Sequence, residues 1–254
     1  MSKDTRPKCV TAALAALLFL GAVSRAEGYE SGPRQVHLVE LYTSEGCSSC
    51  PPADEWLSRL KKSGQLWSQV VPVAFHVDFW DYIGWPDPYA QRSFTRRLQA
   101  IVSGWTAQAL YTPCVVQNGL QVRNWYELEK FQRSRERPGL LKATLVSPDT
   151  YEITFEPSEK PQGELVAFAA LLGMGFISEV KEGENKGRTL RHDFVALDMR
   201  SVDMTAENGV YKARLSFVKN PKERSRPAQP QAIALWVSSK NSPVPIQATG
   251  GWLD

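Results

Sequence analysis

Two cysteines, Cys47 and Cys50, are separated by two residues in the segment EGCSSCPP, Glu45–Pro52. Such a pair can be a redox couple, half of a metal site or a structural disulfide. The two prolines fit only the first turn of a helix, where a missing N–H costs no hydrogen bond. Cys47 would then lie at a helix N-terminus, which stabilises the nucleophilic thiolate. Cys50, one turn into the helix, would resolve the mixed disulfide that Cys47 forms.

The flanking sequence predicts the elements that position this pair. The segment Val36–Tyr42 has large residues on both faces, which is typical of a buried strand. A helix follows at Ala53–Lys62, and Val70–Trp80 is the next predicted strand. A strand–helix–strand unit favours a parallel sheet. A C-x-x-C at the strand-to-helix junction of such a unit indicates a thioredoxin-like redox motif.

A second element of the predicted site is the segment Thr112-Pro113-Cys114, which precedes a short strand and an Asn-Gly hairpin turn. It resembles the cis-proline stretch of thioredoxin-like folds. That likeness implies a cis bond at Pro113, with Thr112 pairing with the substrate backbone. A thiol at Cys114 would then lie close to Cys47 and Cys50. The three cysteines could relay a disulfide or bind a soft metal.

Other polar residues are candidates for a supporting role. Glu40 lies seven residues before Cys47, and a buried carboxylate there could accept the Cys50 proton; the alternative is an ion-paired glutamate. His76 shares a strand face with Asp78 and could join the cysteines as a ligand, although a structural role fits it better. His192, beside two arginines and without a nucleophile, indicates a structural or docking role.

The remaining sequence sets the predicted domain organisation. Between the two predicted site segments we expect an aromatic loop at Trp80–Tyr89 and a helix at Ala90–Val102, and after them a helix at Trp125–Arg133. Beyond Pro138 the chain has short alternating segments separated by Gly, Pro, Asn and Lys, which is typical of an antiparallel β-sandwich. The predicted fold is therefore an α/β thioredoxin-like domain at 27–140, followed by an antiparallel β-sandwich domain at 141–254.

The first 26 residues have the layout of a secretory signal. A basic head precedes the apolar run Val10–Val23, and small residues stand three and one places before a cleavage point after Ala26. The alternative is an uncleaved anchor, but the run is short for a membrane span. We expect export to the bacterial periplasm, where disulfides persist. Cys9 leaves with the signal, and an odd number of cysteines remains, so they cannot all pair within one chain.

Four ordered motifs carry a resemblance to a known family. They read VELYTSEGCSSCPPAD, AFHVDFWDYIGWPDPYA, YTPCVVQNG and, at Glu184–Val195, ENKGRTLRHDFV. Together they resemble the DUF1223 family, and the likeness covers most of the chain after the signal. The resemblance implies an exported protein with a thioredoxin-like domain. It supplies no substrate.

Composition and motifs exclude several functions. The net charge of +3 without a concentrated basic stripe argues against a nucleic-acid partner. The sequence contains no P-loop, G-x-G-x-x-G, G-x-S-x-G or metalloprotease motif. We assign no organic cofactor and no resident metal, and we expect membrane contact only through the signal.

The favoured function is thiol–disulfide exchange on protein or small-molecule thiol partners through Cys47 and Cys50, as in a thiol–disulfide oxidoreductase. One alternative is a copper-binding or copper-delivery module that uses these cysteines with Cys114 or His76, since thiolates suit Cu(I). The other is a non-catalytic binding protein in which the pair is a structural disulfide.

Overall fold

A computed structural model describes Met1, residues 28–217 and residues 230–253. The predicted signal segment, residues 1–26 with Cys9, lies outside the described residues. Among the described residues, no helix combines the length and the apolar character that a membrane crossing needs.

Strands dominate the architecture, with 43% of the described residues in strands and 13% in helices. The largest sheet has eight strands in the order β15-β14-β8-β11-β3-β2-β4-β5. Its strands are β2 (His37–Thr43), β3 (Val70–His76), β4 (Cys114–Gln117), β5 (Leu120–Gln121), β8 (Leu165–Gly173), β11 (Val195–Asp203), β14 (Ala232–Ser239) and β15 (Pro245–Trp252). β2 and β3 run parallel, and β4 runs antiparallel to β2.

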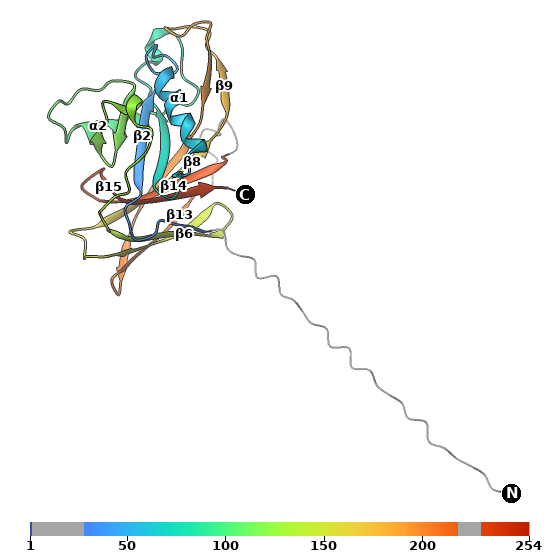
Figure 1. Cartoon of the computed structure of the whole chain (residues 1–254), viewed down its shortest axis with the longest axis vertical. Coiled ribbons are helices and arrows are strands. Elements are labelled where there is room, and N and C mark those ends of the chain that lie inside the picture. The colour runs from blue at the N-terminus through green and yellow to red at the C-terminus, as the bar shows by residue number, and fades with distance from the viewer. Residues whose placement is uncertain (2–27, 218–229, 254) are drawn as a thin grey trace.

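A second sheet and a hairpin complete the β structure. The five-stranded sheet has the order β1-β6-β7-β13-β12. Its strands are β1 (Gly28–Glu30), β6 (Gly139–Ser147), β7 (Thr150–Pro157), β12 (Thr205–Glu207) and β13 (Val210–Ser216). The hairpin pairs β9 (Phe176–Glu179) with β10 (Thr189–His192) and projects beside the first helix (Figure 1).

The helices are few and short. They are α1 (Pro51–Arg59), continued by the 3₁₀ turn η1 (Leu60–Lys62), then η2 (Asp81–Ile83), α2 (Arg92–Val102) and η3 (Trp125–Glu127). The predicted helix at Trp125–Arg133 is wrong, because only its first turn is helical. The short strand predicted after Pro113 is confirmed as β4, and the prolines do stand in the first turn of α1.

The predicted fold class, an α/β thioredoxin-like domain followed by an antiparallel β-sandwich domain, is wrong. Strands from both halves of the chain form one mixed eight-stranded sheet, because β11 joins β3 at the Val195–Ala74 pair. The alternating segments after Pro138 were assigned to strands correctly, but three of them, β8, β11 and β14, extend the first sheet rather than forming a separate sandwich. The predicted domain boundary, between residues 140 and 141, falls inside β6. The division of the chain into two domains stays a prediction.

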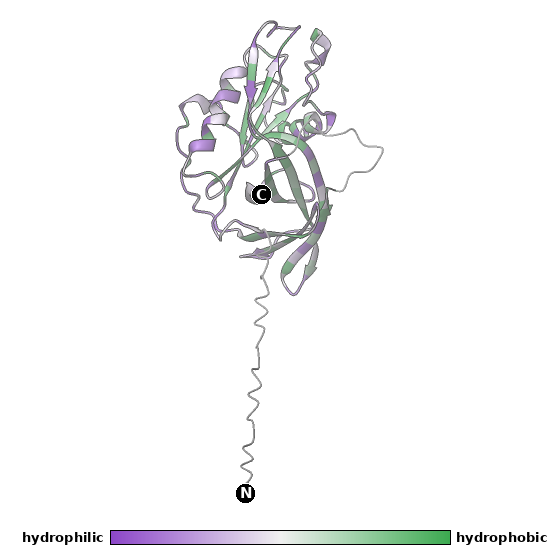
Figure 2. Cartoon of the chain, turned by 90° about the vertical axis from the view of Figure 1, so that its right-hand side faces the viewer, coloured by the Kyte–Doolittle hydropathy of each residue, from purple (hydrophilic) through white to green (hydrophobic). Residues whose placement is uncertain are grey.

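Strand β14, next to the edge strand β15, packs against both halves of the molecule. Trp236 and Ala234 pack into the core beside β2, β3 and the helices. Ile233 and Leu235, on the other face of the same strand, pack into the core against the five-stranded sheet. One strand thus forms a wall of both cores, and apolar colour concentrates on the strands while the helices show polar outer faces (Figure 2).

The two α-helices lie on opposite faces of β2. Thr43 donates a hydrogen bond to Asp54 on α1 (2.9 Å), so this face of the strand carries α1. Glu40, three residues earlier and therefore on the other face, pairs with Arg97 on α2 at 2.6 Å. Arg97 is buried, and its guanidinium lies 4.8 Å from the centre of the Trp236 ring. This pair links α2 to the centre of the sheet.

Replacing Arg97 tests the importance of this pair. We expect Arg97→Met to lower the free energy of unfolding by about 3–5 kcal/mol, because it leaves the Glu40 carboxylate buried and unpaired. Urea denaturation followed by circular dichroism measures the change. Adding Glu40→Gln, whose amide oxygen still accepts from the Tyr42 hydroxyl, is expected to restore part of the loss.

Arg214→Met is the matched control, because it removes the same charge from an exposed pair with Glu152. We expect a change within about 0.5 kcal/mol there. A loss at Arg97 no larger than the loss at Arg214 would contradict the importance of the buried pair.

Candidate functional site

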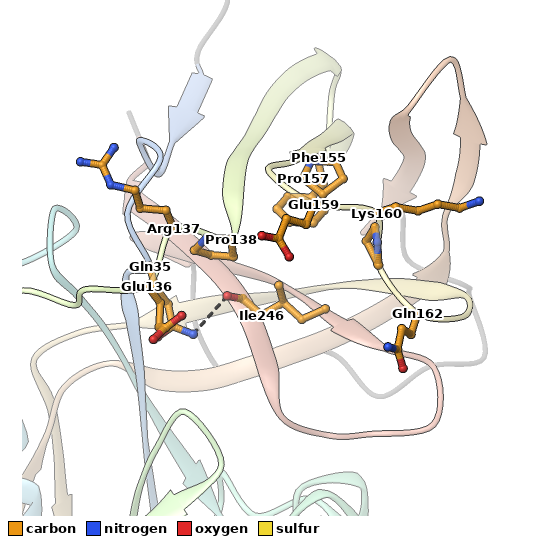
Figure 3. Close-up of a pocket in the computed structure, with 11 residues that line it drawn as sticks. Gln35, Glu136, Arg137, Pro138, Phe155, Pro157, Glu159, Lys160, Gln162 and Ile246 are labelled. Atoms are coloured by element: carbon orange, nitrogen blue, oxygen red, sulfur yellow. Dashed lines mark hydrogen bonds between the residues drawn. The ribbon is translucent and has the colours of Figure 1, made fainter.

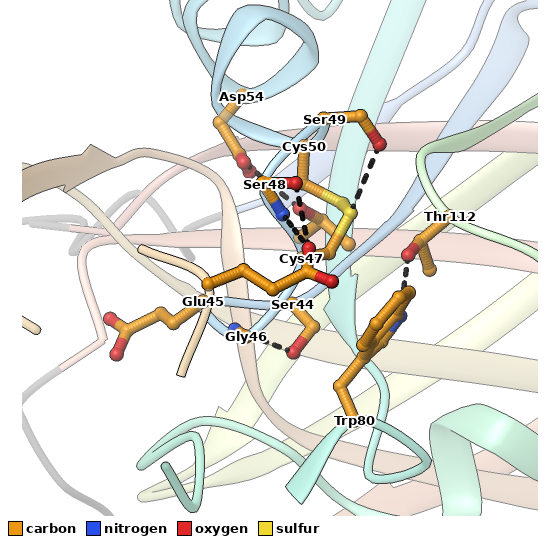
Figure 4. Close-up of a disulfide and its surroundings, with 12 residues drawn as sticks. Ser44, Glu45, Gly46, Cys47, Ser48, Ser49, Cys50, Asp54, Trp80 and Thr112 are labelled. Atoms are coloured by element: carbon orange, nitrogen blue, oxygen red, sulfur yellow. Dashed lines mark hydrogen bonds between the residues drawn. A yellow bond between two sulfur atoms is a disulfide. The ribbon is translucent and has the colours of Figure 1, made fainter. Parts of the chain in front are cut away.

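Cys47 and Cys50 form a disulfide at the start of α1, with their Cα atoms 5.4 Å apart. Cys50 is the N-cap residue of the helix. Both cysteines are buried, at 1% and 0% exposure, whereas Ser48 and Ser49 between them are exposed. The hydroxyl of Ser49 lies 3.4 Å from the Cys47 sulfur (Figure 4). The loop therefore presents polar residues to solvent and keeps both sulfur atoms largely covered.

Two residues far along the chain hold this loop. The side-chain amide of Asn185, which is fully buried, donates to the carbonyl oxygens of Glu45 and Cys47, both at 2.8 Å. The carboxylate of Glu184 accepts from the backbone N–H of Ser48 at 3.0 Å and from its hydroxyl at 2.6 Å. These hydrogen bonds lower the pKa of Glu184. The connection between β9 and β10 thus fixes the conformation of the disulfide loop.

The loop after β3 covers another side of the disulfide. The indole N–H of Trp80 donates to the Thr112 hydroxyl at 2.7 Å, and both residues lie beside the sulfur atoms (Figure 4). A Cβ at Gly46 would lie 3.1 Å from the Cβ of Trp80, so the glycine permits the close approach of this loop. The Thr112–Pro113 bond is cis, as predicted. The substrate-binding role assigned to these two residues stays a prediction.

Cys114 is a free, buried cysteine. It pairs with Tyr42 across the antiparallel β2–β4 ladder, and paired residues point to the same face. That face carries Glu40 and α2, whereas the disulfide belongs to α1 on the other face. The structure therefore does not bring the Cys114 thiol together with Cys47 and Cys50. Burial is the main reason that the pKa of Cys114 rises to about 11, with a smaller contribution from Glu40.

Glu40 is also on the α2 face. Its Oε1 accepts from Arg97 at 2.6 Å and from the Tyr42 hydroxyl at 2.9 Å. Glu40 is therefore the ion-paired glutamate of the two predicted alternatives. It cannot accept a proton directly from Cys50, because the two side chains lie on opposite faces of β2. Burial raises the pKa of Tyr42 well above its usual value, and the Glu40 carboxylate adds to the rise.

A cluster of five buried ionisable groups lies next to the disulfide loop, on the α1 face. It consists of Glu45, Asp54, His76, Asp87 and His192. His76 Nδ1 lies 2.7 Å from Asp87 Oδ2, and the same oxygen accepts the backbone N–H of Glu45 at 2.8 Å. Burial alone would raise the pKa of Asp87, but His76 together with the backbone N–H groups of Glu45 and Tyr89 lowers it. His76 thus connects β3 to the residue that begins the disulfide loop.

His192 occupies the other side of the cluster. Its Nε2 lies 3.2 Å from Glu45 Oε1 and its Nδ1 lies 3.7 Å from Asp54 Oδ1. None of these contacts has the geometry of a hydrogen bond, since both ring nitrogens and Glu45 Oε1 lack a hydrogen-bond partner. Burial would lower the pKa of His192, but Asp54 and Glu45 raise it to about 10. Opposite charges therefore connect β10 with α1 and the disulfide loop.

The family model described as "Protein of unknown function (DUF1223)" matches residues 38–238. The chain belongs to this family. The match includes the disulfide loop, the cis proline, the Glu184–Asn185 pair and every member of the buried cluster, so the whole site lies within the family region. No curated protein matches the chain.

Two solved structures resemble the fold. Protein AGR_C_4864 of Agrobacterium tumefaciens has a TM-score of 0.61 and 23% identity, over 86% of this chain and 94% of that one. HBP35 of Porphyromonas gingivalis has a TM-score of 0.57 and 13% identity, over 88% of this chain and 77% of that one. At these identities the likeness concerns the fold alone.

Sequence reasoning missed several members of this site. Asp54 and Asp87 were not singled out, and His192 was assigned a structural or docking role. His76 and His192 are 116 residues apart in the sequence, and their rings lie 5.0 Å apart between centroids. The available signal was the motif at Glu184–Val195, which contains Asn185 and His192, but its position in space could not be derived from periodicity.

A pocket of about 600 Å³ lies at the other end of β2 (Figure 3). Its lining includes Gln35, which precedes β2, and Pro138, Phe155 and Ile246. Cys47 follows the opposite end of β2, so a seven-residue strand, about 23 Å long, separates the pocket from the disulfide. The pocket is therefore not part of the candidate site.

The buried position of Cys114 predicts low reactivity. A pKa of about 11 in place of 9.0 lowers the thiolate fraction near pH 8 by about 100-fold, and burial slows the reaction further. In protein carrying Cys9→Ser, Cys114 is the remaining free thiol. We expect iodoacetamide to leave the folded protein unmodified at pH 8, and the rate to rise only as the pH approaches 11.

Mass spectrometry measures the modification, and the same protein in urea is the control, where rapid reaction is expected. Equal rates in the folded and the urea-treated protein would contradict a buried, protonated thiol.

Proposed function

We propose that this protein catalyses thiol–disulfide exchange through Cys47 and Cys50. The observation that carries the proposal is the disulfide at the first turn of α1, with Thr112 among its surroundings (Figure 4). The positive end of the α1 dipole favours negative charge on Cys47. In the reduced protein the Cys47 thiolate attacks a partner disulfide, forms a mixed disulfide and releases one partner sulfur as a thiolate. Cys50 then attacks the Cys47 sulfur, releases the other partner sulfur as a thiolate and restores the Cys47–Cys50 disulfide.

A hollow next to the cis proline supports an extended chain as the partner. It has a volume of about 260 Å³, and its lining includes Tyr111, Pro113, Val122 and Trp125. Trp125 packs against Trp56 on α1, so the hollow is on the same face of the sheet as the disulfide. Aromatic and apolar walls of this kind suit side chains of a bound peptide.

The carboxylates around the loop influence the direction of exchange. Glu184 bonds to Ser48 between the two cysteines, and Asp54 lies in the first turn of α1. Negative groups at these positions disfavour thiolates and therefore favour the disulfide over the dithiol. Once its Cys47–Cys50 disulfide has been reduced, the protein would therefore donate electrons to its partner. The expected export to the periplasm is part of the proposal, since the site is then in an oxidising compartment.

The copper alternative, with Cys114 or His76 beside the cysteine pair, is not favoured by any contact. Cys114 points to the α2 face, and Cys47 and Cys50 are bonded to each other. The remaining alternative is a structural disulfide, which the burial of both sulfur atoms would suit. The reduction potential of the Cys47–Cys50 disulfide distinguishes a structural disulfide from one that takes part in exchange.

Equilibration with thiol redox buffers is the first test. We expect a reduction potential above about −300 mV, because an inert structural disulfide has a lower value. The ratio of dithiol to disulfide is measured by thiol alkylation and mass spectrometry. A value well below −300 mV would exclude exchange and leave the structural disulfide.

Trapping is the second test. The Cys50→Ser variant is expected to hold its partner on Cys47 as a mixed disulfide, because the resolving thiol is missing. Non-reducing gels of the exporting cells, followed by mass spectrometry, identify the adduct. Cys114→Ser alone, with the pair intact, is the matched control and is expected to trap nothing. The proposal fails if Cys50→Ser traps no more than this control.

A further inference from the structure

Each histidine of the buried cluster has a carboxylate close to one ring nitrogen. Nδ1 of His76 is hydrogen-bonded to the Asp87 carboxylate at 2.7 Å, and Nε2 of His192 lies 3.2 Å from the Glu45 carboxylate without the geometry of a hydrogen bond. The nitrogens on the other side of the two rings, Nε2 of His76 and Nδ1 of His192, are buried and have no hydrogen-bond partner. Histidines that bind metals commonly hold a carboxylate with one ring nitrogen, which orients the other nitrogen toward the ion.

Asp54 supplies a third donor. Its Oδ2 accepts from Thr43 at 2.9 Å, while its Oδ1 lies 3.7 Å from Nδ1 of His192. Asp54, His76 and His192 each offer one ligand atom, and these three atoms lie within 4.8 Å of one another. They come from α1, β3 and β10, so three separate elements converge on one point.

The cluster contains more acidic than basic groups. Glu45, Asp54 and Asp87 are buried carboxylates, and protonation of both imidazoles would still leave one negative charge. A divalent ion bound by two neutral imidazoles would leave the same net charge, so it offsets the buried carboxylates as well as two protons would. The charge count therefore fits a metal ion, and the geometry of the ring nitrogens is what favours it over protons.

We propose that Asp54, His76 and His192 bind a divalent transition-metal ion, with Asp87 and Glu45 orienting the two imidazoles. Two imidazole nitrogens and one carboxylate oxygen suit zinc and its neighbours rather than magnesium or calcium, which take oxygen ligands. Ligands of a tetrahedral zinc ion lie roughly 3.4 Å apart. Ligand atoms that now lie up to 4.8 Å apart would therefore approach one another by about 1.4 Å at most. Three protein ligands leave the fourth place for water.

This site is distinct from the disulfide and does not depend on the proposed exchange. Metal binding would hold α1 against β3 and β10. On α1 the ligand is Asp54, which lies four residues after Cys50. The competing occupant is a proton, with His192 as an imidazolium between Asp54 and Glu45. The experiment is therefore designed to separate metal from proton, and histidine ligands from thiol ligands.

Cobalt titration of the oxidised protein is the first measurement. Protein carrying Cys9→Ser and Cys114→Ser is treated with EDTA and kept as the Cys47–Cys50 disulfide, so that free thiols are excluded. We expect one equivalent of Co²⁺ to bind, with visible absorption of a low-coordinate nitrogen–oxygen site and without a thiolate charge-transfer band. Zn²⁺ is expected to displace it. Absence of saturable binding to the oxidised protein would overturn the proposal.

Histidine variants identify the ligands. His76→Gln and His192→Gln are each expected to weaken Co²⁺ binding by at least 100-fold. His37→Gln is the matched control, because the chain has three histidines and His37 bonds to Gln132 and Asn118 instead. Equal affinity of all three variants would show that the cobalt is bound elsewhere.

A measurement on the unaltered protein keeps the test decisive if these variants fail to fold. Long-range ¹H–¹⁵N NMR spectra resolve the ring nitrogens of the three histidines during a Zn²⁺ titration. We expect the nitrogens of His76 and His192 to shift in proportion to bound zinc, while those of His37 stay unchanged. Shifts confined to His37, or unchanged spectra with His192 doubly protonated throughout, would overturn the proposal in favour of the proton.

Discussion

The buried charge cluster beneath the disulfide loop is the constraint on which the rest of the site depends. Each carboxylate that leaves water costs several kcal/mol unless it is paired, so none of its members can move alone. Glu45 begins the loop, Asp54 stands in α1, His76 ends β3 and His192 ends β10. Because these groups need one another, the chain must bring four separate segments together before the loop has its observed form. The hydrogen bonds of Asn185 then hold the loop in place.

The sheet separates this cluster from a second set of buried charges. Glu40 and Arg97 lie on the α2 face of β2, whereas Thr43 and Asp54 meet on the α1 face. Alternation along one strand therefore divides the polar interior into two compartments. Cys114 falls into the Arg97 compartment, which explains why a cysteine next to the cis proline is not a third member of the disulfide site.

The local features of the site could be predicted from the sequence, and the long-range ones could not. The prolines after Cys50 indicated the start of a helix, and the context of Pro113 indicated a cis bond; both are confirmed. The alternating segments after Pro138 indicated strands, but alternation does not specify a partner, so the pairing of β11 with β3 was missed. The face of Cys114 depends on its register with Tyr42, which spacing alone does not determine.

The proposed metal site and the proposed exchange site would be coupled by charge. The N-terminus of α1 carries a partial positive charge that stabilises nearby anions. The Asp54 carboxylate lies in the first turn of α1, so it competes with a Cys47 thiolate for this stabilisation. While Asp54 carries an uncompensated negative charge, the disulfide is favoured over the dithiol. A cation bound to Asp54 removes this competition, and the helix N-terminus can then stabilise the Cys47 thiolate. The occupant of the buried cluster, proton or metal, would therefore shift the balance between a structural disulfide and an exchanging one.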